Sequence, residues 1–173
     1  MRKINFTKTV ACGNDFVVVD RLSDWPVSQL RKIAQKICDR KYGIGADGLL
    51  VLEKSRIADV KMRIFNPDGS EAQMCGNGAR CVALWEKSEV SAKGGSASGG
   101  RSQKSEFEIE TKAGTIKSEV NGDNVKIKLT EPRDLKLDIP IRVNNKTLRV
   151  NFINTGVPHT VLFVAGLDKI DVL

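Results

Sequence analysis

The chain has 173 residues, of which 40% are hydrophobic and 28% are charged, and its formal net charge is +7. This composition is typical of a globular protein with one domain or two small lobes. Lys and Arg alternate with acidic residues instead of clustering, so the charge does not indicate a nucleic-acid partner. No apolar run has the length of a signal peptide or a membrane span, and we therefore expect a cytoplasmic protein.

Four cysteines and a single histidine limit the metal and redox chemistry that the chain can carry. Cys12, Cys38, Cys75 and Cys81 show no C-x-x-C spacing, and His159 stands alone, so we expect no metal site. A reducing compartment keeps thiols free, which favours burial or catalysis over a disulfide.

The first third of the chain predicts a hairpin followed by a helix. Two β-rich runs flank the turn-forming residues ACGND, which predicts a hairpin with Asn14 at or just past its tip. The apolar spacing over 28–41 predicts an amphipathic helix that is capped by Ser28, stops at Gly43 and buries Cys38. The glycine-rich GIGADG that follows is interpreted as a loop, because a strand and no Lys-Ser/Thr pair comes after it.

The middle of the chain predicts a strand, a tight turn and a buried helix. Residues 60–65 form a strand pattern, and the NPDGS after them is a strong turn signal. The apolar run 79–85 predicts a helix that begins at the CGNG loop. It is apolar nearly all the way round, as a helix enclosed by a sheet would be. The Gly- and Ser-rich segment 91–105 predicts a flexible loop.

The remaining segments predict antiparallel strands. EFEIETKAGTIKSEVNGDNVKIKLTE alternates apolar and polar residues between turn signals, which is typical of a meander. The strand-turn-strand pattern at the start of the chain has a weak echo in VNFINTGVPHTVLFV from Val150. Few helices among many strands place the chain in the α+β class.

The segment QMCGNGARC combines a thiol, two glycines and an asparagine where the central helix is expected to begin. Free backbone N–H groups and the dipole at a helix N-terminus would favour a reactive thiolate at Cys75. Gly76 and Gly78 let the backbone approach an anionic group, and Asn77 can both donate and accept hydrogen bonds. Cys81 lies about 240° farther round the helix and is interpreted as packing. On composition alone, a buried structural Cys75 is the alternative.

The motif FNPDGSEAQMCGNGARC, together with GNDF, CDRKYGIGADG and NTGVPH, resembles the diaminopimelate epimerase family, with the motifs in the same order. The resemblance implies an N-terminal lobe over 1–121, in which an antiparallel or mixed sheet wraps around a central helix. It implies the start of an incomplete second lobe over 122–173. It further implies a cofactor-independent isomerase that interconverts LL- and meso-diaminopimelate in lysine biosynthesis, with two thiols transferring the α-proton on opposite faces.

Carried over residue by residue, the resemblance assigns roles to six positions. By this assignment, Cys75 is the catalytic residue, and His159 adjusts the acidity of the thiols. The residues that bind the substrate are Asn14, Asn66, Gly76 and Asn77. The implied substrate is a small diamino-dicarboxylate. The resemblance implies no cofactor, no metal, no nucleic acid and no membrane as partners. It leaves open whether the protein forms a homodimer.

The chain also departs from the family pattern. Gly48 and Val157 stand where some members bind substrate through a glutamine and an asparagine, so we expect those contacts to be absent or replaced. The chain ends before the glutamate-arginine and ACGTG-like motifs that carry the second thiol, so we expect this chain alone to be inactive or impaired. Cys12 in ACGND lies in the first hairpin and is interpreted as a local substitution.

Three other functions stay open on the sequence. A non-catalytic ligand-binding or interaction module would keep half of the site without turnover. A proline or hydroxyproline racemase relative would share the fold, although such proteins typically carry histidine where this chain has Asn77. A hydrolase that uses Cys75 and His159 fits on residue types alone, but no orienting or oxyanion-binding partner can be named for it.

Overall fold

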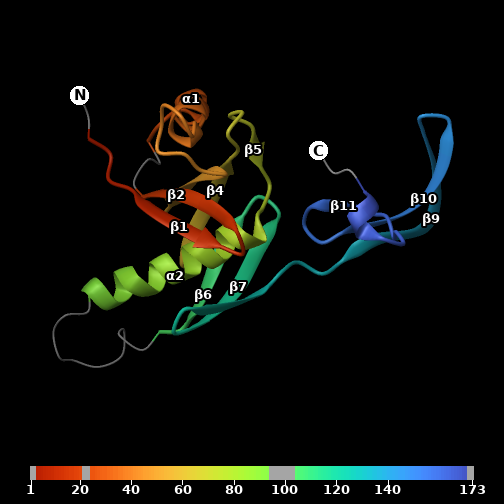
Figure 1. The fold of residues 1–173 in the computed structure, drawn as a ribbon. Coiled ribbons are helices and arrows are strands. Elements are labelled where there is room, and N and C mark those ends of the chain that lie inside the picture. Colours follow the sequence, from red (N-terminus) through yellow and green to blue (C-terminus); the bar gives the residue numbers. More distant parts are fainter. Residues whose placement is uncertain (1–2, 21–23, 94–103, 171–173) are drawn as a thin grey trace. The chain divides into compact units, whose positions relative to one another are not determined.

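The computed structural model describes residues 3–20, 24–93 and 104–170 (Figure 1). The chain divides between Thr130 and Glu131 into two compact units. The boundary expected after residue 121 falls in the turn of a hairpin that belongs to the first unit.

Within the described residues of the first unit, eight strands form one mixed sheet. They are β1 (Thr7–Ala11), β2 (Asn14–Asp20), β3 (Gly48–Glu53), β4 (Val60–Phe65), β5 (Glu71–Ala72), β6 (Glu106–Thr111), β7 (Gly114–Asn121) and β8 (Asn124–Lys128). Their order is β1-β2-β3-β4-β6-β7-β8, with β5 paired to β4. The β2–β3 and β4–β6 pairs are parallel and the others are antiparallel, so the predicted α+β class with a mixed sheet is confirmed.

The predicted N-terminal hairpin is confirmed, and its turn determines where Asn14 lies. Cys12 and Gly13 connect β1 to β2 with φ angles of 49° and 86°. Positive φ at both central residues is the pattern of a type I′ turn, whose twist matches that of the flanking strands. Asn14 is therefore the first residue of β2, opposite Ala11, at the end of the sheet.

Helix α1 (Val27–Cys38) covers one face of the sheet and packs against β3 and β4. Its buried residues include Cys38, as the helical spacing predicts, and they contact Leu49 and Val51 of β3. Side chains alternate along a strand, so the residue between these two, Leu50, faces the other side of the sheet.

Both predicted ends of this helix are wrong by a few residues. The helix begins after Pro26, whose carbonyl accepts the first helical hydrogen bonds, and Ser28 lies inside the first turn. It ends at Cys38 instead of continuing to Gly43. The reason is that the Asp39 carboxylate accepts hydrogen bonds from the next N–H groups of the chain, which draws the backbone into a turn.

Helix α2 (Gly76–Lys93) lies on the opposite face of the sheet from α1 (Figure 1). It packs against β1, β2, β4, β6, β7 and β8, and its residues Ala79, Val82 and Ala83 are fully buried. The sheet therefore curls around α2. The prediction of a central helix enclosed by a sheet is confirmed.

Helix α2 also extends farther than the predicted apolar run and reaches Lys93. It thus includes the first residues of segment 91–105, where the sequence predicts a loop. The hydroxyls of Ser88 and Ser91 donate to helix carbonyls three and four residues earlier, so the helix accommodates these residues. Residues 94–103 of the predicted loop lie outside the described residues.

The second unit consists of an antiparallel sheet and a 3-10 helix. Its described elements are β9 (Arg133–Val143), β10 (Lys146–Asn154), β11 (Pro158–Val161) and η2 (Leu167–Lys169). The β10–β11 hairpin confirms the strand-turn-strand unit that the sequence predicts from Val150. In neither unit do the described residues include a helix of the length and apolarity that a bilayer span requires.

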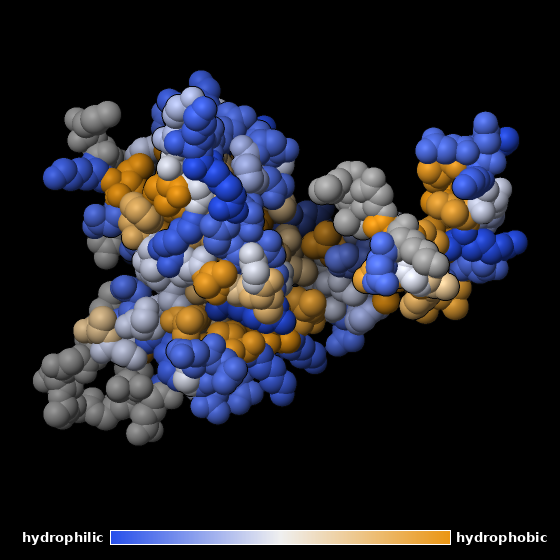
Figure 2. Space-filling view, viewed as in Figure 1, coloured by the Kyte–Doolittle hydropathy of each residue, from blue (hydrophilic) through white to orange (hydrophobic). Residues whose placement is uncertain are grey.

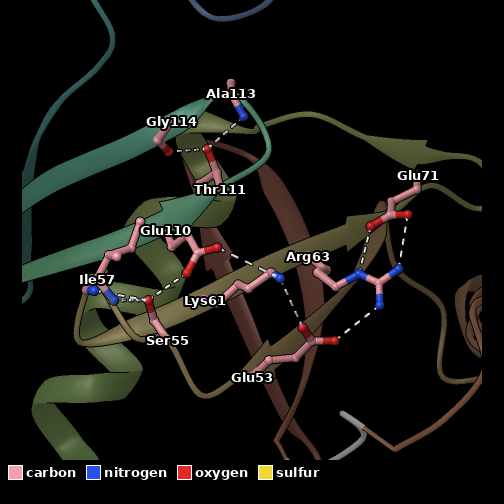
Figure 3. Close-up of polar contacts among 11 residues, drawn as sticks. Glu53, Ser55, Ile57, Lys61, Arg63, Glu71, Glu110, Thr111, Ala113 and Gly114 are labelled. Carbon is pink, nitrogen blue, oxygen red and sulfur yellow. Dashed lines mark hydrogen bonds and ion pairs between the residues drawn. The ribbon is translucent and has the colours of Figure 1, made fainter.

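An ion-pair network crosses the first sheet from β3 to β6 (Figure 3). Arg63 of β4 donates to Glu71 of β5 at 2.7 Å and to Glu53 of β3 at 3.1 Å. Lys112 pairs with Glu71 at 2.7 Å, and the Glu71 side chain is only 5% exposed. The network holds the short strand β5 against β4, directly before the chain reaches Cys75.

Replacing Arg63 with methionine is expected to lower the free energy of unfolding by about 3 kcal/mol, because two largely buried carboxylates lose their shared partner. Denaturant titration measures the change. Lys117→Met is the matched control, since Lys117 pairs with Glu108 where the two side chains are 72% and 44% exposed. The control should change stability by less than about 0.5 kcal/mol, and an equal loss in both variants would contradict a special role for Arg63.

The pH dependence of this difference is a second test of the network. Burial alone would raise the pKa of Glu71, but hydrogen bonds from Arg63 and Lys112 outweigh it, and the pKa lies below its ordinary value of 4.5. A depressed carboxyl pKa stabilises the fold above its unfolded-state value and stops doing so as the pH falls through the folded-state value. The stability advantage of the wild type over Arg63→Met should therefore shrink below about pH 4.5.

Candidate active site

Cys75 lies immediately before α2, at the N-cap position. Its carbonyl accepts the first helical hydrogen bond from the Ala79 N–H at 2.9 Å, and its Sγ accepts one from the Gly78 N–H at 3.4 Å. The sulfur thus occupies the place where a capping side-chain oxygen would accept from a free helix N–H. An N–H donor and the positive end of a helix dipole both stabilise a thiolate.

Two glycines shape the first turn of α2. A β-carbon at Gly78 would lie 3.1 Å from Cδ2 of Leu50 and 3.5 Å from Cβ of Cys75, so α2 approaches β3 as closely as a glycine permits. A β-carbon at Gly76 would lie 3.5 Å from Cδ1 of Ile127 in β8, which is ordinary contact. The first N–H groups of a helix have no acceptors within it, so this turn is suited to an anionic group.

Hydrogen bonds join the predicted site residues Asn14 and Asn77 directly. Nδ2 of Asn77 donates to Oδ1 of Asn14 at 2.7 Å, and Nδ2 of Asn14 donates to Oδ2 of Asp47 at 3.1 Å. At the other end, Arg80 donates to Oδ1 of Asn77 at 2.9 Å. The structure therefore brings Asn14 together with the first turn of α2, two residues beyond Cys75.

Asn66 lies at the same end of the sheet as Asn14. Strands β2 and β3 are parallel and β4 is antiparallel to β3, so the start of β2, the start of β3 and the end of β4 share one edge. Asn66 directly follows β4. Its Nδ2 donates to the Ser70 hydroxyl at 2.9 Å, within the turn that the sequence predicts.

His159 belongs to the second unit, whereas the other predicted site residues belong to the first. It lies in β11, opposite Ile153 of β10, and its side chain is exposed. Val157, where some relatives have a substrate-binding asparagine, lies in the turn before β11, and its carbonyl accepts from the Thr155 N–H at 3.2 Å.

The three remaining thiols occupy environments unlike that of Cys75. Burial raises the pKa of Cys38 to about 11 and also raises the pKa of Cys81, so both stay protonated at neutral pH. Cys12 is exposed in the β1–β2 turn. It lines a cleft of about 520 Å³ with Arg80 and Cys81, between the β1 and β8 edges of the sheet. Apolar side chains reach the surface around α2 in this region (Figure 2).

A cluster of charges beside Asn14 is not apparent from the sequence. Arg40 contacts Oδ1 of Asp15 at 2.8 Å and Oδ1 of Asp47 at 2.7 Å, and Lys8 contacts Asp15 at 2.8 Å. Hydrogen bonds from Arg40 and Lys8 hold the pKa of Asp15 well below its usual range. The motifs GNDF and CDRKYGIGADG contain the two aspartates and the arginine, but neither motif indicates that these residues meet in the fold.

The described residues contain no group of three His, Cys, Asp or Glu side chains that could hold a metal ion. The polar groups near Cys75 are instead two amides, a backbone N–H group and the Arg80 guanidinium, which suit a ligand with carboxylate and amine groups.

The sequence model of the diaminopimelate epimerase family matches residues 6–134, a range that includes Cys75 and all the site residues of the first unit. The chain belongs to the diaminopimelate epimerase family. His159 lies outside the matched range.

Curated relatives named diaminopimelate epimerase support the assignment. The protein of Caldanaerobacter subterraneus subsp. tengcongensis is 41% identical over 96% of this chain and 62% of its own length. That of Carboxydothermus hydrogenoformans is 39% identical over 97% of this chain and 63% of its own length. The chain thus spans a little over three fifths of the curated relatives it matches, at 62% and 63%.

Solved structures agree with the fold. A phenazine biosynthesis protein of the PhzF family from Bacillus anthracis superposes with a TM-score of 0.64 at 24% identity, over 97% of this chain and 58% of its own. A hydroxyproline epimerase from Agrobacterium vitis, with bound trans-4-hydroxy-L-proline, gives a TM-score of 0.64 at 16% identity, over 92% of this chain and 50% of its own. At these identities the likeness concerns the fold alone.

Gly48 provides a stability test of the packing at this edge. A β-carbon there would lie 3.2 Å from the Phe65 carbonyl oxygen and 3.3 Å from Cδ1 of the buried Phe16. Gly48→Ala should therefore lower the free energy of unfolding by about 1–2 kcal/mol through overpacking. Gly76→Ala, which has room for the methyl group, should be neutral or stabilising by up to about 1 kcal/mol in the same denaturation assay. Equal effects would contradict the described difference in packing.

Proposed function

We propose that the chain forms the Cys75-bearing part of a diaminopimelate epimerase that interconverts LL- and meso-diaminopimelate in lysine biosynthesis. The observation that carries the proposal is the Cys75 thiol at the N-cap of α2, with the Gly78 N–H 3.4 Å from its sulfur and Asn77 in the same turn. Membership of the family and the names of the relatives support the reaction.

In the proposed reaction, the Cys75 thiolate removes the proton from the α-carbon of the substrate. The S–H bond forms as the C–H bond breaks, and the electron pair stays on the α-carbon. Return of a proton from the same side restores the original centre, whereas a second thiol on the opposite face gives inversion. Asn14, Asn66, Gly76 and Asn77 are proposed to hold the carboxylate and amine groups of the substrate, and His159 is proposed to tune the acidity of the thiols.

The proposal extends to the setting of the reaction. The residues from Glu131 onward would begin a second lobe. The enzyme would act in the cytoplasm on a small diamino-dicarboxylate, without cofactor, nucleic acid or membrane, and a homodimer stays open as its assembly.

Selective alkylation tests the role of Cys75. A small electrophile that carries an α-amino-acid group should label Cys75 at least about tenfold faster than exposed Cys12, the advantage expected from one additional good hydrogen bond. Cys38 and Cys81 should stay unlabelled in the native protein, since burial keeps both thiols protonated. Peptide mass spectrometry measures each rate, and iodoacetamide, which lacks the amino-acid group, is the control reagent. Uniform labelling of all four thiols would argue against the site.

Exchange of the substrate α-proton with deuterated water tests the chemistry itself. The wild type should introduce deuterium at the α-carbon of diaminopimelate, and Cys75→Ser should lose this activity by at least about 100-fold because the proton acceptor is removed. NMR or mass spectrometry of the amino acid follows the exchange, with Cys81→Ser as the control for loss of a thiol. Selective labelling of Cys75 without any exchange would identify a ligand-binding module instead.

A further inference from the structure

The two amides of the site lie in one chain of hydrogen bonds that has an arginine at one end and a carboxylate at the other. Arg80 donates to Oδ1 of Asn77 at 2.9 Å, and Nδ2 of Asn77 donates to Oδ1 of Asn14 at 2.7 Å. Nδ2 of Asn14 then donates to Oδ2 of Asp47 at 3.1 Å. The chain links the first turn of α2 to the edge of the sheet.

The two ends determine the direction of the whole chain. A guanidinium group can only donate hydrogen bonds, and an ionised carboxylate can only accept them. Asn77 must therefore turn its oxygen toward Arg80, and Asn14 must turn its nitrogen toward Asp47. Each amide keeps one N–H and one oxygen lone pair outside the chain, so their positions are set by Arg80 and Asp47.

Asp47 is itself held by donors. Nη2 of Arg40 donates to Oδ1 of Asp47 at 2.7 Å, and the Asp15 N–H donates to Oδ2 at 3.1 Å. The Asp47 N–H donates back to the Asp15 carbonyl at 2.8 Å, which fixes the backbone of the loop before β3. Arg40 is in turn shared with the Asp15 carboxylate. The acceptor end of the chain is thus fixed by contacts independent of Asn14.

We propose that Asp47, held by Arg40, and Arg80 are positioning residues that orient the Asn14 and Asn77 amides toward the substrate. The inference rests on the function proposed above for the Cys75 site. Asp47 acts through Asn14, and Arg80 acts through Asn77. Their role is to decide whether each amide offers an N–H or an oxygen to a carboxylate or amine group of the ligand.

The substitution Asp47→Asn tests this because it replaces one acceptor atom with a donor at nearly constant shape. The new amide would turn its oxygen toward the charged donor Arg40, so its nitrogen would face Asn14 and could no longer accept from the Asp15 N–H. Asn14 would then rotate to accept, and its nitrogen would meet the nitrogen of Asn77. Two donors cannot share a hydrogen bond, so the chain must break or reverse.

NMR of the side-chain amides of the 173-residue chain reads the orientation directly. In Asp47→Asn, the Nδ2 signals of both Asn14 and Asn77 should shift, and their hydrogens should exchange faster with water. Asp39→Asn is the matched control, since this carboxylate accepts from the N–H groups of Lys41 and Tyr42 in the same loop. The control should leave both amide signals unchanged. Arg80→Lys keeps a donor-only group next to Asn77, so it should leave the Asn14 signal unchanged and the exchange of both amides slow.

The alkylation rates of Cys75 give the functional readout. With the amino-acid electrophile, Asp47→Asn should react about tenfold more slowly than the wild type, the loss expected from one misdirected hydrogen bond. With iodoacetamide the rates should agree within about twofold, because the thiol and its N–H donor are unchanged. Arg80→Met should likewise react more slowly with the amino-acid electrophile but not with iodoacetamide, whereas Arg80→Lys should keep the wild-type rates with both reagents. These variants test the hydrogen-bond chain from its other end if Asp47→Asn folds poorly.

Two results would overturn the inference. Unchanged amide signals in Asp47→Asn would show that Asn14 and Asn77 are oriented by other groups. Equal slowing with both electrophiles would show that Asp47 supports only the local fold. A wild-type chain without any preference for the amino-acid reagent would instead refute the proposed function, and the amide signals would still decide the orientation.

Discussion

The close packing of the first turn of α2 against β3 is the constraint on which the rest of the site depends. Gly78 lies where a β-carbon would be 3.1 Å from Leu50, whose side chain is fully buried and cannot move aside freely. The same glycine supplies the N–H that contacts the Cys75 sulfur. The position of the thiol is therefore set by the contact between helix and sheet as well as by the residues beside it.

The topology of the sheet places the remaining polar groups of the site near the first turn of α2. Parallel pairing of β2 with β3 places Asn14 near Asp47, because both residues lie where their strands begin. The type I′ turn at Cys12 and Gly13 brings the chain to Asn14 without an intervening loop. On the other side, the Arg63 network anchors the short β5, from which the chain continues into Cys75. Each functional group thus follows an element whose place is fixed by packing or by ion pairs.

Local patterns predict much of this arrangement from the sequence. The hairpin, the central helix and the position of Cys75 at its start follow from spacing over a few residues, and the structure agrees. The predicted N-cap at Ser28 is wrong, because Pro26 precedes the helix and no side chain caps it. Arg80 lies three residues from Asn77 on α2, a spacing at which helix side chains meet, but Asp47 could not be assigned in this way. Asn14 meets Asp47 across 33 residues of sequence and Asn77 across 63, and no local pattern predicts which polar groups the folded sheet will bring together.

The directional chain from Arg80 to Asp47 also has an entropic consequence. A free asparagine side chain samples several rotamers and both amide orientations, and a ligand that binds it must restrict that freedom. Asn14 and Asn77 already hold one orientation in the absence of a ligand. Their side-chain entropy is lost during folding, where the packing of α2 against the sheet compensates for it. A ligand that meets these amides encounters a preorganised surface, and more of its contact energy is left for affinity and for discrimination between similar amino acids.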